Sequence, residues 1–109
     1  MKFILILSLL SSTLTSVFAK EFSVLQFNIW QEGTKVTGGF DKIIDIIIAS
    51  KADIITLSEV RNYKKKDLHK KLVDALATKG HQFYGEYAGG DAGLISKFPI
   101  LKSFIINDQ

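Results

Sequence analysis

Apolar residues, four of them isoleucines, recur at helical spacing between two strand-like apolar runs. The five residues fall at positions i, i+3, i+4, i+7 and i+8: Phe40, Ile43, Ile44, Ile47 and Ile48. This spacing places them on one face of a helix over residues 40–50. The runs at residues 21–30 and 52–60 are rich in Val, Leu, Ile and Phe, which predicts strands. Because β-branched residues are weak helix formers, tertiary packing must stabilise this helix.

The rest of the chain continues the same alternation. A second apolar stripe predicts a helix over residues 67–79: Leu68, Leu72, Ala75 and Leu76. Gly80 then stands where a helix C-cap glycine belongs. Further strands are predicted over residues 81–87, 92–97 and 100–106, with a turn at residues 88–91 and a break at Pro99. This order predicts the α/β (α+β) class.

The first nineteen residues have the pattern of a secretory signal peptide. Lys2 precedes an apolar run over residues 3–10, and Val17 and Ala19 occupy the −3 and −1 positions of a small-residue cleavage site. We therefore expect export to the periplasm or the medium, with residues 20–109 as the mature part. A buried N-terminal helix or an uncleaved anchor is the alternative. The chain has no cysteine, so packing alone must stabilise it, and its net charge of +3 is too mild to imply a nucleic-acid partner.

Polar residues follow the apolar runs of the first two predicted strands. Asn28 ends the first run, and Glu59 and Arg61 end the second. Strand alternation groups Asn28 with Gln26 and Trp30, and groups Glu59 with Ile55, Leu57 and Arg61. A carboxylate beside an amide suits Mg²⁺, and an arginine can bind phosphate. From spacing alone, Asn28 capping a turn and Glu59 pairing with Arg61 or a lysine remain open.

Three motifs resemble those of the endonuclease/exonuclease/phosphatase family. They are "LQFNIW", "ADIITLSEVRN" and "DAGLISKFPI", in family order. The family includes DNase I-like nucleases, AP endonucleases, inositol polyphosphate phosphatases and secreted sphingomyelinases. Ser58 stands where the family usually has Gln, and Lys97 where it has Arg. The resemblance implies a four-layered α/β sandwich, with two mixed, mostly antiparallel sheets flanked by helices.

The resemblance also implies roles for individual residues. Glu59 would bind Mg²⁺ (Mn²⁺ and Ca²⁺ are alternatives), and Asn28 would support the metal or the scissile phosphate. Asp91 matches an acidic position of some nuclease members. Arg61 and Tyr63, with Asn62 between them, could reach the substrate. The implied reaction is metal-assisted hydrolysis of a phosphoester, with nucleic acid, phospholipid or a small phosphoester as the substrate and no obligate protein partner evident.

The second half of the family's machinery has no counterpart in this sequence. There is no Asp-x-Asn and no Ser-Asp-His motif. His69 is expected on a solvated helix face and His81 at the start of a strand, and neither matches a family histidine. Because such sandwiches need roughly 200–250 residues, we expect residues 20–109 to be the N-terminal part of a truncated domain, inactive by itself. The alternative is a non-catalytic exported remnant that at most binds a partner or a phosphate ligand.

A run of lysines follows the Glu59 motif. It comprises Lys64, Lys65, Lys66, Lys70 and Lys71. Such a run could track a phosphate backbone. Because Asp67 and Asp74 interrupt it, we favour a solvated helix face.

Overall fold

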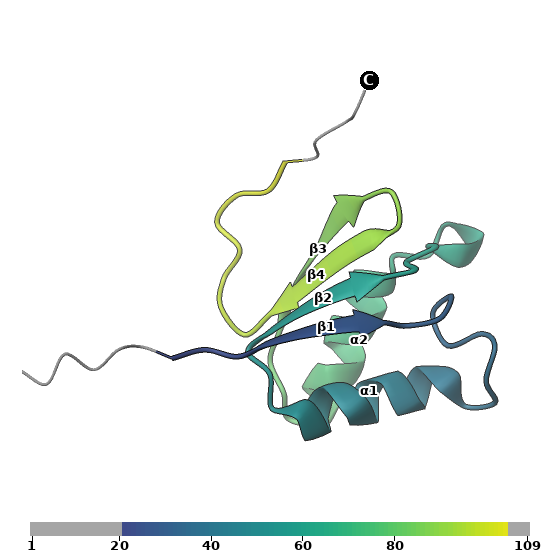
Figure 1. Ribbon diagram of the computed structural model, residues 1–109, viewed down its shortest axis with the longest axis horizontal. Helices are drawn as coiled ribbons and strands as arrows, with labels where there is room; N and C mark the ends of the chain where they lie inside the picture. Colours follow the sequence, from purple (N-terminus) through teal and green to yellow (C-terminus); the bar gives the residue numbers. More distant parts are fainter. Residues whose placement is uncertain (1–20, 105–109) are drawn as a thin grey trace, which may run out of the picture.

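Four strands form one mixed sheet in the computed structural model, which describes residues 21–104 (Figure 1). The strands are β1 (Val24–Asn28), β2 (Ile54–Ser58), β3 (Tyr84–Gly89) and β4 (Ala92–Ser96). Their order in the sheet is β1-β2-β4-β3, with β1 and β2 parallel and the other neighbours antiparallel. The predicted α+β class is confirmed. The predicted signal peptide lies outside the described residues.

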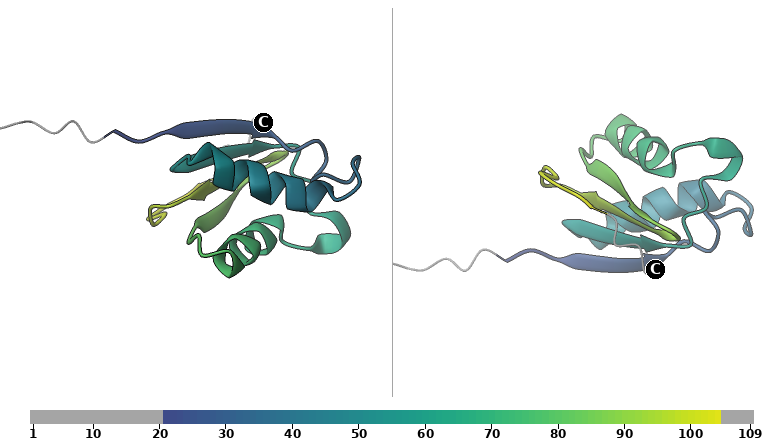
Figure 2. Two further views of the ribbon diagram at one scale, coloured as in Figure 1. Left: turned by 90° about the horizontal axis from the view of Figure 1, so that it is seen from below. Right: turned by 90° about the horizontal axis from the view of Figure 1, so that it is seen from above.

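Both helices, α1 (Gly39–Ser50) and α2 (Leu68–Thr78), cover the same face of this sheet (Figure 2). A crossover helix such as α1 is how two parallel neighbours are usually joined. Most of the fully buried side chains come from both helices and from the two central strands: Ile44, Ile47, Ile55, Leu57, Leu72, Leu76 and Ile95. Val60, just after β2, is also fully buried. Each helix begins and ends within one residue of its predicted bounds. The prediction succeeds because each helix buries one apolar stripe, and that stripe can be seen in the sequence.

Local signals bound α2 at both ends. The Asp67 carboxylate accepts a hydrogen bond from Lys70 N at 3.2 Å and caps the N-terminus. At the other end Gly80 has a φ of 83°, a left-handed conformation that glycine adopts without steric cost. The prediction of a C-terminal glycine is confirmed there.

The last predicted strand is wrong in its described part. Residues 100–104 have no regular structure, and residues 105–106 lie outside the described range. The side chains of Leu101 and Phe104 are 95% and 76% exposed. Apolar composition alone does not make a strand, because a strand needs a neighbour with which to pair its backbone.

His69 is also not where the sequence predicted it. His69 is 3% exposed, and its side chain packs against the sheet instead of facing solvent. Gly93 lies opposite the imidazole, where a Cβ would overlap the ring, and Gly85 lies opposite His69 Cβ. The two glycines thus make room for a side chain that the helix periodicity assigns to the polar face.

The opposite face of the sheet carries the exposed side chains of Val24, Gln26 and Asn28. No helix among residues 21–104 lies on it (Figure 2). In that same part of the chain, no helix has both the length and the apolar character to span a membrane.

Candidate metal site at the ends of β1 and β2

Glu59 and Asn28 lie together where β2 and β1 end. Asn28 Nδ2 donates to Glu59 Oε1 at 3.1 Å, and the backbone N–H of Gln31 donates to Glu59 Oε2 at 2.9 Å. Asn28 Oδ1 accepts from the backbone N–H of Trp30 at 2.8 Å. The Asn28 amide therefore links the carboxylate to the turn that follows β1.

Strand alternation by itself would place these two side chains on opposite faces. Asn28 pairs with Ser58 across the parallel register, so the next residue, Glu59, should point toward the helices. Glu59 instead has a φ of 64°, and this left-handed backbone redirects its side chain to Asn28. The predicted grouping of Glu59 with Ile55 and Leu57 is therefore wrong. A non-glycine residue in this conformation costs about 1–3 kcal/mol and persists only where its surroundings hold it.

The turn after β1 is left-handed over several residues. Trp30, Gln31 and Glu32 have φ values of 42°, 54° and 60°. This turn ends the strand alternation before Trp30, so the predicted grouping of Trp30 with Asn28 is wrong. The turn also brings the Gln31 amide to the Glu59 carboxylate.

Glu32 was not among the predicted site residues. Its Oε2 atom accepts from the backbone N–H groups of both Arg61 (2.7 Å) and Asn62 (2.6 Å). Tyr63 OH donates to Gln31 Oε1 at 2.9 Å, so a second side chain joins the same two loops. No sequence pattern indicates these contacts, because they depend on two left-handed turns meeting at one end of the sheet.

Arg61 and Asp91, two other predicted site residues, form an ion pair with each other. The backbone reinforces this contact, since the N–H of Val60 donates to the Asp91 carbonyl at 3.0 Å. The pair brings the β3–β4 turn to the loop after Glu59. The Arg61 charge is therefore balanced within the described fold.

Neither histidine hydrogen-bonds Glu59. The ring nitrogens of His69 have no hydrogen-bond partner, and Nδ1 lies 3.7 Å from the nearest Asp67 carboxylate oxygen. Burial lowers the pKa of His69, while the negative charges of Asp67, Glu86 and Glu32 act in the opposite direction. His81, expected at a strand start, precedes β3 and donates its N–H to the Leu76 carbonyl at 2.9 Å.

The lysine run divides between a loop and a helix. Lys64 and Lys65 belong to the 3-10 turn η2 (Tyr63–Lys65), with φ values of 57° and 58°. Lys70, on α2, pairs with Asp74 at 2.6 Å. The expected solvated helix face is therefore confirmed only for the part of the run on α2.

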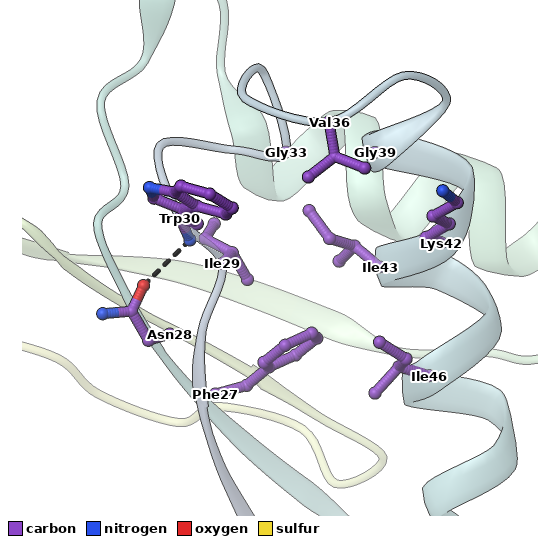
Figure 3. A pocket seen from close by; sticks show the side chains of 10 residues that line it. All are labelled: Phe27, Asn28, Ile29, Trp30, Gly33, Val36, Gly39, Lys42, Ile43 and Ile46. Carbon is purple, nitrogen blue, oxygen red and sulfur yellow. Dashed lines mark hydrogen bonds between the residues drawn. The ribbon is translucent and has the colours of Figure 1, made fainter.

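An apolar pocket of about 230 Å³ lies between β1 and α1. Phe27, Ile43 and Ile46 face it, whereas the Asn28 amide points away from it (Figure 3). The pocket and the Glu59 carboxylate thus lie on different sides of β1.

The donor set fits Mg²⁺ in one respect. This ion is commonly held by one or two carboxylates together with water and substrate phosphates, and the half-buried Glu59 keeps free lone pairs beyond its two hydrogen bonds. Asn28 uses its oxygen on Trp30 and its NH₂ on Glu59, so in this arrangement it supports the carboxylate. Within residues 21–104, no group of three or more Asp, Glu, His or Cys side chains could hold a metal.

Comparison of the chain with protein-family models, with curated proteins and with solved structures gives no match.

Proposed function

We propose that this protein is an exported, Mg²⁺-dependent phosphoester hydrolase of the endonuclease/exonuclease/phosphatase type. The observation that carries the proposal is the Glu59 carboxylate, which Asn28 and the Gln31 amide hold at the ends of two parallel strands. The backbone of Glu59 is left-handed and therefore strained. Strained residues cluster at functional sites. The finer fold proposal is a four-layered sandwich, in which a second sheet packs on the face of this sheet that no described helix covers.

Each residue has a part in this proposal. Mg²⁺, when bound, supplies positive charge that stabilises developing charge on phosphate oxygens. Glu59 holds the ion and Asn28 orients Glu59. Arg61, Tyr63 and Asp91 lie in the loops around this carboxylate, where a phosphodiester of nucleic acid, phospholipid or a small molecule would bind.

A second candidate is a non-catalytic exported module that at most binds a partner or a phosphate ligand. The ion pair between Arg61 and Asp91 favours it. A guanidinium already paired with a carboxylate stabilises a loop and is less available to a phosphate.

Mn²⁺ binding tests the metal assignment without requiring turnover. Paramagnetic Mn²⁺ should broaden the amide NMR signals of residues 28–32 and 58–62 in the full chain. Glu59→Gln keeps the side-chain shape but removes the charge, so this broadening should disappear at the same Mn²⁺ concentration. Asp41→Asn is the matched control, because Asp41 is an exposed carboxylate in the first turn of α1. Equal broadening in wild type and Glu59→Gln would end the assignment and leave the non-catalytic reading.

A further inference from the structure

We propose that Glu32 is the positioning residue of the Glu59 site, an inference that rests on the proposed metal-binding function. Glu32 holds the backbone just beyond Glu59 through Arg61 N and Asn62 N. In return, Glu59 holds the backbone just before Glu32 through Gln31 N. The two glutamates thus fasten the two loops to each other in both directions.

These reciprocal contacts between the two loops, here called the clasp, act on a segment with left-handed backbone. Glu59 and Asn62 have φ values of 64° and 47°, and the two amides that Glu32 accepts are those of Asn62 and of Arg61 just before it. Each such hydrogen bond makes a modest net contribution to the stability of the folded loop. Without them, the loop can relax toward right-handed or extended backbone, and the Glu59 side chain would then turn away from Asn28.

The loop that carries Glu32 is itself anchored. The N–H of Gly33 donates to the Ile29 carbonyl at 2.8 Å. Gly33 also lies so close to Gly39, at the start of α1, that a Cβ on either would overlap the other's backbone. Glu32 is therefore held in place independently of the loop that contains Arg61 and Asn62.

A single oxygen of Glu32 accepts both hydrogen bonds, so two substitutions at this position can test the proposal. Oε2 accepts both N–H groups, so the single carbonyl oxygen of a glutamine could accept them as well. Glu32→Gln should preserve the clasp, whereas Glu32→Ala should abolish it. A residue that acted by its charge, for example as a metal ligand, would lose its role in both variants.

The first measurement is amide exchange with solvent, followed by NMR in the full chain. Glu32→Ala should speed exchange at Arg61 and Asn62 by about tenfold or more. It should also speed exchange at Gln31, whose N–H binds Glu59. Glu32→Gln should stay near wild type. The control is Glu86→Ala. It removes a glutamate of β3 that accepts a hydrogen bond from Ser103 Oγ at 2.6 Å. An unchanged Gln31 amide in Glu32→Ala would overturn the inference, because the effect would then stop short of Glu59.

The second measurement is Mn²⁺ affinity from the broadening near Glu59. Loss of a supporting residue typically weakens metal binding by about 10–100-fold, and we expect this for Glu32→Ala with near-complete rescue in Glu32→Gln. Equal affinity in wild type and Glu32→Ala, or equal losses in both variants, would overturn the positioning role. If wild type binds no Mn²⁺ while Glu32→Ala still frees the Gln31 amide, the metal proposal fails and the positioning of Glu59 stands.

Discussion

Adding one methyl group at Gly93 should destabilise the whole domain through His69. Gly93 lies on β4 opposite Leu57, two residues before Glu59, and a Cβ built there overlaps the imidazole. Space beside the same side chain is also tight at the neighbouring strand, because a Cβ at Gly85 would lie 3.0 Å from His69 Cβ. Overpacking of this kind costs about 1–3 kcal/mol, a large share of the roughly 5–15 kcal/mol that stabilises a typical domain. Gly93→Ala should therefore lower Tm by about 4 °C or more.

The assay is thermal and urea unfolding followed by circular dichroism, on wild type, Gly93→Ala, His69→Ala and the double variant. Removing the imidazole frees the space that the new methyl group needs. The two substitutions should therefore be coupled by about 0.5–3 kcal/mol in the free energy of unfolding. In an exposed strand, alanine would be slightly more stable than glycine, so the sign itself is informative. An unchanged or raised Tm in Gly93→Ala, or strictly additive effects, would refute the packing of His69 against β4.

Two further predictions concern α2. Burial lowers the pKa of His69 below its ordinary 6.5, so the unfolded chain binds the proton at a higher pH than the folded chain does. This contribution to stability is complete above about pH 6.5 and is lost as the pH falls through the lowered pKa. Measured by urea unfolding, the His69→Leu variant should therefore lose less stability than wild type between pH 7 and pH 5. Equal losses in the two proteins would contradict the prediction. Asp67→Ala removes the N-cap hydrogen bond to Lys70 N and should cost about 0.5–2 kcal/mol by urea unfolding. Asp74→Ala, which breaks only the exposed pair with Lys70, should cost about 0.3–0.5 kcal/mol, and the two penalties should not be equal.

Sequence periodicity predicted the helices and the class of fold because both depend on local spacing. The isoleucines of α1 and the leucines of α2 mark one buried stripe each, and Gly80 marks the end of α2 by its own backbone preference. The same local reasoning failed for residues 100–104, where apolar residues have no strand beside them. It also failed for His69, because the space that buries it is made by Gly85 and Gly93, more than ten residues away in the chain.

The candidate site likewise has one part that the sequence predicted and one part that it did not. The order of residues shows that an amide and a carboxylate follow two apolar strands, and the resemblance of the motifs selected Asn28 and Glu59. That these side chains meet could be seen only in the folded chain. Their contact requires a left-handed Glu59, a turn of four left-handed residues after β1, and a Glu32 carboxylate that accepts two amides from the other loop. Alternation along a strand predicts the opposite arrangement, because strained backbone conformations are held by distant partners and leave no period in the sequence.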